Sequence, residues 1–390
     1  MRIGVIGTGV AGALLLAGLR AAPGIAAIGF ERVGAGERDE AGTALNLCPN
    51  ALKALRLHRP DRHAALRAAS RPWRRWTTAL ADGTPLLDLD LLDVAEEPGA
   101  CLRWADLYAL LRAPVAGATQ HGHALEALEE DAAGRLVPVF RAGDALVRHG
   151  GFDLLVAADG RYSRLRALAE GAEPAPRFIG LAMSRLLVTD GTGCPFEDYG
   201  QWFNGPNRLL AYRLPGGAAY IAGAFPMPPE APFTPAMQEA GHAARLYLPQ
   251  EGPVAPAVAW MVRRIEAGIG AMHWARVQVT PFARAALGGR VLHLGDAAHA
   301  MMPTLGQGAT QAIEDGVLAA AVLARGEAAI ARFAALRDAR VEFVRRLSED
   351  ATDTMLPGAD PVTGTLRKGE PGFLAALRRL YTEVPGPGEI

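Results

Sequence analysis

The sequence contains few cysteines, and none of them forms a local pair. Cys48, Cys101 and Cys194 are the only three in 390 residues, and no CxxC or CxxxxC motif occurs. Such motifs supply the adjacent thiolates of zinc knuckles and redox dithiols. Their absence excludes a disulfide-stapled miniprotein and a disulfide reductase, and we expect no metal site. We interpret the three thiols as side chains of a protein from a reducing, cytoplasmic compartment.

The chain also lacks an excess of charge and a long apolar run. The 40 basic side chains nearly balance the 41 acidic ones, which leaves a formal charge of -1. This balance gives no overall attraction to nucleic acid phosphates or to anionic lipids. The longest apolar run, residues 10–19, ends at Arg20 and is shorter than the ~20 residues that a membrane-spanning helix needs. We therefore expect neither nucleic acid nor a membrane as a partner.

The N-terminal segment has the pattern of a nucleotide-binding βαβ unit. An apolar strand is followed by Gly7-Thr-Gly9-Val-Ala-Gly12, an Ala/Leu-rich helix and a second apolar run that ends at Glu31. Gly7 permits the turn, Gly9 allows a pyrophosphate to approach, and Gly12 allows the helix to pack on the strand. The helix N-terminus offers free N–H groups to an anion, and Glu31 is placed to accept hydrogen bonds from a ribose. The segment predicts dinucleotide binding.

Two further segments place acidic residues after apolar strands. In the first, residues 153–166, the strand ends in Asp159-Gly160; in the second, residues 295–308, Asp296 precedes a Gly-Gln-Gly turn that opens a helix. An Asp-Gly pair alone usually marks a turn. At the carboxyl end of a strand, however, Asp296 can bind a polyol hydroxyl, and the helix N-terminus can stabilise the negative charge of a reduced flavin ring.

These three motifs together resemble the class A flavoprotein monooxygenases, the group typified by para-hydroxybenzoate hydroxylase. The motifs stand in the family's order and span most of the first 325 residues. The resemblance implies a tightly held FAD that is reduced by a transiently bound NADH or NADPH. It also implies that O2 then forms a flavin C4a-hydroperoxide, which hydroxylates a small phenolic or N-heteroaromatic substrate. We expect a monomer or a homodimer.

The expected fold class is α/β, with a Rossmann-like FAD-binding domain and an interleaved antiparallel sheet that binds the substrate. We expect helices at 49–57, 102–111, 308–325 and 373–381, a β-meander at 123–150, strands at 209–214, 218–224 and 291–294, and a loop at 357–372. The FAD domain is expected to comprise residues 1–70, 100–175 and 275–345. The substrate domain is expected at 71–99 and 176–274, and a helical extension at 346–390.

The resemblance assigns cofactor contacts to individual residues. The three glycines of the first motif would line the pyrophosphate, Glu31 the adenosine ribose, and Arg32 the adenine. Arg103 would contact FAD between the ribityl chain and the phosphate, and Asp296 would bind the ribityl chain or the pyrophosphate. Asp159 would be associated with both FAD and the pyridine nucleotide. The remaining expected contacts are Val10, Ala11, Leu125, Gly160, Pro303, Gly306, Gln307, Gly308 and Ala309. Thr310 stands where many relatives have Asn, which puts any side-chain contact there in doubt.

The substrate side is predicted from strand alternation. Arg208, Leu210 and Tyr212 lie on one side of a strand at 208–212. Arg208 can pair with a substrate carboxylate or phenolate, and Tyr212 can hydrogen-bond a ring hydroxyl and raise its nucleophilicity. The alternative is an exposed arginine and a half-buried tyrosine in an ordinary sheet. His299 is interpreted as a structural residue rather than a catalytic base.

Two other functions remain open at this point. One is an FAD enzyme of the same fold with a different reaction, such as ring-opening oxygenation or isoprenoid reduction. The other is a non-catalytic FAD-binding sensor. Trp73 and Trp76 do not form the Trp-x-Trp-x-Ile-Pro motif of flavin halogenases, which argues against that branch. A plain NAD dehydrogenase does not explain the Gly-Asp segment.

Overall fold

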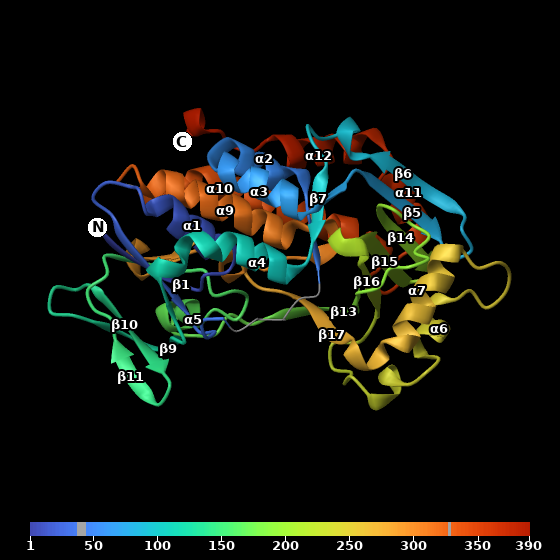
Figure 1. Cartoon of the computed structure of the whole chain (residues 1–390), viewed down its shortest axis with the longest axis horizontal. Coiled ribbons are helices and arrows are strands. Elements are labelled where there is room, and N and C mark those ends of the chain that lie inside the picture. Colours follow the sequence, from blue (N-terminus) through green and yellow to red (C-terminus); the bar gives the residue numbers. More distant parts are fainter. Residues whose placement is uncertain (37–43, 327–328) are drawn as a thin grey trace.

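The computed structural model describes residues 1–36, 44–326 and 329–390. Figure 1 shows one half of the molecule in which most of the helices gather, and a second half in which helices α6 (His242–Tyr247) and α7 (Pro256–Ala267) lie beside a sheet. Strands and helices alternate through much of the chain, and the expected α/β fold class is confirmed.

The first half is built on a six-stranded sheet in the order β18-β19-β12-β1-β2-β8. Strand β1 pairs in parallel with β2 and β12, and β12 pairs in parallel with β19. Parallel pairing brings the carboxyl ends of these strands to one edge, where α/β sheets bind their ligands. Gly7, Asp159 and Gly295 follow neighbouring strands at this edge. The strands are β1 (Arg2–Ile6), β2 (Ala26–Glu31), β8 (Thr119–His121), β12 (Leu154–Ala157), β18 (Ala285–Ala286) and β19 (Val291–His293).

Helices α1 (Val10–Leu19) and α9 (Gln307–Leu323) pack against each other through small residues. A Cβ at Gly316 would lie 2.7 Å from the carbonyl oxygen of Ala11, and one at Gly18 would lie 2.5 Å from Ala320 Cβ. This close contact holds the two glycine-rich turns, one before each helix, near each other. The other helices of this half are α2 (Pro49–His58), α3 (Pro60–Ala69), α4 (Trp104–Arg112), α5 (Arg164–Glu170), α8 (Asp296–His299) and α10 (Ala329–Asp350).

The second half contains a seven-stranded sheet in the order β17-β13-β16-β15-β14-β5-β6. Helices α6 (His242–Tyr247) and α7 (Pro256–Ala267) pack on one face through an apolar cluster. The opposite face packs against α10, α12 (Pro371–Thr382) and the loop after α8. The strands are β5 (Arg75–Leu80), β6 (Pro85–Asp90), β13 (Arg177–Val188), β14 (Tyr199–Asn204), β15 (Asn207–Arg213), β16 (Ala219–Pro226) and β17 (His273–Val279).

Two three-stranded sheets complete the fold. One consists of β3 (Leu45–Leu47), β7 (Gly99–Leu102) and β4 (Arg71–Trp73), and the other of β9 (Ala124–Glu130), β10 (Leu136–Ala142) and β11 (Ala145–Arg148). The second forms the β-meander that the sequence predicts at 123–150. Figure 1 shows it projecting from the first half of the molecule.

One prediction is wrong, because residues 357–372 are not a simple loop. Helix α11 (Pro361–Arg367) lies within them. Asp360 caps it by accepting hydrogen bonds from the backbone N–H groups of Val362 and Thr363, and Pro361 occupies its first turn. Both residues are favourable at a helix start, although Asp and Pro are also typical of turns. The proposed domain boundaries stay a prediction; β17 extends to Val279, past the expected boundary at 274.

In the part of the chain that the structure describes, no helix combines the length and apolar character required to cross a membrane. Within the same residues, no group of three or more His, Cys, Asp or Glu side chains is placed to hold a metal ion.

Candidate active site

A cavity of about 370 Å³ opens at the carboxyl edge of the six-stranded sheet. It is bordered by residues from all three sequence motifs, which the parallel strands bring to the same edge. Of the residues predicted to contact the cofactor, twelve line it: Gly7, Gly9, Val10, Ala11, Glu31, Arg32, Leu125, Asp159, Gly160, Asp296, Gly308 and Ala309.

The glycines in and beside this cavity have two different roles, and Gly12 is not part of the lining. A Cβ at Gly12 would lie 2.0 Å from the carbonyl oxygen of Gly7, so the protein itself requires glycine there. A Cβ at Gly9 or Gly308 would meet no atom closer than 3.8 Å, and one at Gly160 would meet nothing within 4 Å. All three border the cavity. At Gly9 and Gly308 the missing side chain keeps backbone accessible to a ligand, whereas Gly160 also has a positive φ of 84° that itself favours glycine. The site therefore fits a bound dinucleotide.

Glu31 lies at the end of β2 with only 6% of its surface exposed. Its Oε2 atom accepts hydrogen bonds from the backbone N–H of Thr8 (3.0 Å) and from Arg112 (3.4 Å). The Arg112 guanidinium also lies 4.5 Å from the ring centroid of Tyr108. Arg112 and Tyr108 both line the cavity, and sequence reasoning missed them.

Arg103 is not among the residues that line this cavity. It precedes the first turn of α4 and forms an ion pair with Asp106, with half of its side chain exposed. Arg112, at the other end of the same helix, provides the cavity with a guanidinium. The sequence motif thus marks a helix that borders the cavity, and a cofactor contact by Arg103 stays a prediction.

Asp159 combines a structural role with its position at the cavity. Its carboxylate accepts hydrogen bonds from Ser163 Oγ and from the backbone N–H of Leu165 (3.1 Å). These bonds tie the end of β12 to the start of α5. Burial outweighs them and raises the pKa of Asp159 above its ordinary value.

The loop that carries Asp296 is held by buried charges. Asp315 Oδ2 accepts hydrogen bonds from the Gly295 N–H (2.8 Å) and from His299 (2.7 Å), and Oδ1 accepts one from Arg337 (2.9 Å). His299, Asp315 and Arg337 are fully buried. Burial alone would raise the pKa of Asp315, but the neighbouring His299 and the arginines hold it well below its usual range. His299 therefore supports the loop, in agreement with the structural interpretation.

The remaining predicted residues lie beside the cavity rather than on its lining. Gly306 has a positive φ of 64°, and a Cβ there would lie 2.6 Å from Asn46 Nδ2. Gln307 is fully buried and accepts a hydrogen bond from Asn50 (3.1 Å). Pro303 begins a short 3-10 helix and is exposed. Their contacts with the cofactor stay predictions.

Thr310 makes contacts within the protein. Its hydroxyl donates to the carbonyl oxygen of Gly306 (3.1 Å) and accepts from the backbone N–H of Cys48 (3.1 Å). The side chain is fully buried and does not line the cavity. In this chain the hydroxyl stabilises the turn from Gly306 to Gly308 against the start of α2.

The seven-stranded sheet presents a second set of polar groups. We call its α10-facing side the substrate face. Arg208 is 3% exposed and Tyr212 is 1% exposed, so the alternative of an exposed arginine in an ordinary sheet is wrong. Leu210 and Tyr212 pack in one cluster, and Leu209 and Ala211 pack in the cluster on the opposite face, as the alternation predicts.

Tyr199 lies at the centre of the substrate face and was not predicted. Its ring stacks on Trp73 (centroids 5.0 Å apart) and on Tyr212 (6.0 Å), and its hydroxyl accepts a hydrogen bond from Gln201 (2.8 Å). Burial raises the pKa of Tyr199 to about 12 and that of Tyr212 well above its ordinary value. Both hydroxyls are therefore protonated at neutral pH, and they can donate hydrogen bonds but cannot act as bases.

The substrate face adjoins the cofactor cavity through one loop. Asp296 and Gly308 line the cavity. Between them, Met301 packs in the cluster of Tyr212, and Met302 packs against Phe203. Strand pairing and this loop therefore bring the two regions together, although they are separate in the sequence.

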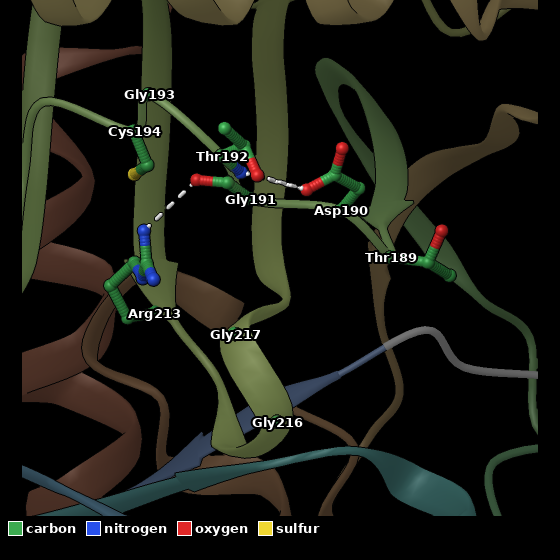
Figure 2. Close-up of a pocket in the computed structure, with 9 residues that line it drawn as sticks. All are labelled: Thr189, Asp190, Gly191, Thr192, Gly193, Cys194, Arg213, Gly216 and Gly217. Atoms are coloured by element: carbon green, nitrogen blue, oxygen red, sulfur yellow. Dashed lines mark hydrogen bonds between the residues drawn. The ribbon is translucent and has the colours of Figure 1, made fainter.

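A different cavity of about 410 Å³ lies between residues 189–194 and the turn at 215–217. Figure 2 shows that three of its polar side chains, Arg213, Asp190 and Thr192, already form hydrogen bonds within the protein. Arg213 donates to the carbonyl oxygen of Gly191 (3.1 Å), and Asp190 accepts from the Thr192 hydroxyl (2.6 Å). None of the predicted site residues lines it, so we assign the candidate active site to the first cavity and the substrate face.

Comparison with known proteins indicates the cofactor class and the family. Residues 269–351 match the family model described as FAD binding domain. A 3-amino-4-hydroxybenzoate 2-monooxygenase of Streptomyces platensis is 33% identical over 90% of this chain and 87% of its own. A 6-hydroxynicotinate 3-monooxygenase of Pseudomonas fluorescens is 29% identical over 90% of this chain and 91% of its own.

Solved structures show the same fold. Klebsiella pneumoniae HpxO, in complex with FAD and uric acid, superimposes with a TM-score of 0.83 at 23% identity over 99% of this chain and 97% of that one. Pseudomonas aeruginosa PqsL superimposes with a TM-score of 0.76 at 19% identity over 94% of this chain and 99% of that one. With the cavity geometry and the full-length sequence similarity, these findings show that the chain belongs to the FAD-dependent aromatic monooxygenases, the para-hydroxybenzoate hydroxylase-like flavoproteins.

Proposed function

We propose that this monooxygenase hydroxylates a small hydroxylated aromatic or N-heteroaromatic carboxylate, and that Arg208 binds the carboxylate. NADH or NADPH and O2 are its proposed co-substrates. A cytoplasmic location and a monomeric or homodimeric state are part of the same proposal. The names of two relatives support the substrate class, because a benzoate and a nicotinate are both aromatic carboxylates.

The observation that carries the proposal is the isolation of Arg208. In the part of the chain that the structure describes, its guanidinium forms no hydrogen bond or ion pair, and its Nε is buried. Burial lowers the pKa of Arg208, and among the described residues only tyrosines such as Tyr199 oppose this shift. An uncompensated buried charge is costly. A substrate carboxylate would supply the missing partner, and a planar guanidinium suits it through two parallel hydrogen bonds.

In the proposed mechanism, the cofactor supplies the reaction chemistry, and the protein binds the cofactor, orients the substrate and excludes water. FAD, when bound, supplies the redox and oxygen-transfer chemistry. Gly9, Gly160 and Gly308 would hold it through exposed backbone. Arg208 would orient the substrate, and the aromatic wall of Trp73 and Tyr199 would exclude water from the reacting ring.

Hydrogen bonding on the substrate face gives the substrate its orientation. The Tyr199 hydroxyl already accepts a hydrogen bond from Gln201, so its own proton remains available to a substrate oxygen. Because burial holds Tyr212 protonated, we assign Tyr212 a positioning role rather than proton removal. Activation of the ring would then come from ionisation of the substrate hydroxyl itself, favoured by the nearby positive charge of Arg208.

The test is substrate-stimulated oxidation of NADH and NADPH, with product analysis, on hydroxybenzoates, hydroxynicotinates and the matching carboxamides. We expect hydroxylation of a carboxylate. Substitution Arg208→Met should raise the KM for that substrate about a hundredfold, or about 2.7 kcal/mol, and should leave the carboxamide within a few fold. Arg213→Met, on the other face of the same strand, is the control. Equal activity on acid and amide in the unsubstituted enzyme would contradict the proposal.

A further inference from the structure

The C-terminal segment contributes a second buried cation on the side of the substrate face. Lys368 follows α11 and is 4% exposed. Its Nζ donates hydrogen bonds to Asp353 Oδ1 (2.8 Å) and to the carbonyl oxygen of Gly364 (3.1 Å). An ammonium group has three N–H donors, so one of them is not used by these bonds.

Strand register places α11 beside the substrate face. A Cβ at Gly369 would lie 3.6 Å from Leu87 Cδ1. Leu87 pairs with Thr78, and Thr78 pairs with Gln201. Directly paired residues project from the same face of a sheet, and Gln201 bonds to Tyr199 on the substrate face. The C-terminal segment therefore packs on the substrate face at the edge strand β6.

The charges around Lys368 do not balance locally. Asp353 forms ion pairs with both Lys368 and Arg367 (2.7 Å). Arg208 has no partner among the described residues. Its cross-strand partner Phe203 packs in one apolar cluster with Met355, two positions after Asp353. Burial lowers the pKa of Lys368, the ion pair with Asp353 opposes this, and Arg208 adds to the lowering. Lys368 and Arg208 are thus two buried cations on this side of the sheet, and the carboxylate of Asp353 already pairs with Arg367 as well as with Lys368.

We propose that Lys368 is a specificity-determining residue, which acts with Arg208 to select a negatively charged substrate. The inference rests on the proposed function and extends it to the C-terminal segment. Asp353 holds the ammonium group in place, and the free N–H together with the positive charge favours an anion over a neutral analogue. Arg208 makes the direct contact with the carboxylate, and Lys368 increases its affinity.

The first experiment compares two substitutions of the only lysines in the chain, Lys53 and Lys368. Lys53 pairs with Glu96 at the surface, so Lys53→Met is the matched control. Lys368→Met should raise the KM for the carboxylate substrate at least tenfold, with a smaller change in kcat, and should leave the carboxamide within twofold. Lys368→Arg should retain most of the preference for the acid. An equal loss for acid and amide, or no loss, would overturn the proposal.

A second variant separates charge selection from a merely structural role. Asp353→Asn keeps an oxygen that can accept the Lys368 hydrogen bond and removes the negative charge that offsets the ammonium group. At a pH low enough to keep Lys368 protonated, affinity for the anionic substrate should therefore stay the same or increase. A structural role predicts the opposite, because Lys368→Met and Asp353→Asn would then both reduce FAD content and activity on every substrate. If Lys368→Met fails to fold, Lys368→Arg and Asp353→Asn still give opposite expectations for the two roles.

The same measurements distinguish failure of this inference from failure of the proposed function. If the unsubstituted enzyme shows no preference for acids over amides, the proposed function fails. If it shows the preference, and Arg208→Met abolishes it but Lys368→Met does not, only the inference about Lys368 fails.

Discussion

The cofactor cavity is bordered mainly by backbone atoms, whereas the substrate face consists of side chains. The cavity is formed largely by backbone at strand ends, and three of its glycines leave open space. The substrate face is formed by side chains of several strands and of the C-terminal segment, with a buried arginine that has no partner among the described residues. Backbone contacts depend on short local motifs, whereas side-chain contacts depend on register and packing. One scaffold can therefore keep a constant cofactor site while its substrate site varies.

Substitution of a buried charged residue behind the cavity should cause the largest loss of stability. Arg337 is fully buried and bonds to both Glu314 and Asp315. Arg337→Met leaves two buried carboxylates without this partner and should reduce the free energy of unfolding by about 3 to 5 kcal/mol. Arg346→Met on the same helix, where the side chain is largely exposed, should change it by less than about 0.5 kcal/mol. Denaturant unfolding measures both, and equal effects would contradict the assigned network.

Substitutions of Gly12, which packs against the protein, and of Gly9, which lines the cavity, separate an effect on stability from an effect on FAD binding. Gly12→Ala places a methyl group 2.0 Å from the Gly7 carbonyl oxygen and should destabilise the apoprotein by about 1 to 3 kcal/mol. Gly9→Ala meets no protein atom closer than 4.0 Å and should leave apoprotein stability nearly unchanged while weakening FAD binding at least tenfold. Thermal unfolding without FAD and flavin titration measure the two effects. Tight FAD binding by Gly9→Ala would argue against the assigned pyrophosphate contact.

A smaller loss of stability is expected at acid pH, and it comes from His293 in the strand that leads to Asp296. His293 is buried in β19, and burial lowers its pKa to about 4. The unfolded chain takes up a proton near pH 6.5, where the folded protein does not. The contribution of His293 to the free energy of unfolding is therefore fully present above pH 6.5, and it decreases progressively as the pH falls to 4. Asp315, whose folded pKa is depressed, adds a further loss only below the ordinary range of a carboxylate.

The measurement is the melting temperature between pH 7 and pH 4.5. We expect it to fall by on the order of 5 °C, and His293→Gln should flatten the profile in this window. The Arg208 region should contribute little to the change, because an arginine does not titrate there. A melting temperature that rises as the pH decreases to 4.5 would contradict the buried, neutral His293.

Some parts of this molecule follow from local sequence, and others do not. The motif at residues 7–12, the Asp-Gly pair and the Gly-Asp segment each predict a strand end followed by a turn, and the structure brings them to one edge. Arg112 was missed because the motif around Arg103 marks a helix but not which of its turns faces the cavity. Helix α11 was missed because Asp360 and Pro361 favour a helix start and a turn equally well.

The sequence by itself determined the dinucleotide-binding unit, the fold class and the monooxygenase family, because glycines and strand-end acids act through the backbone near them. Only the tertiary structure decided which side chains meet on the substrate face. Tyr199 and Tyr212 become neighbours through antiparallel register, and Lys368 reaches the same face of the sheet from a segment more than 150 positions away. The physical reason is that burial and charge balance are properties of packing, which no short stretch of sequence contains.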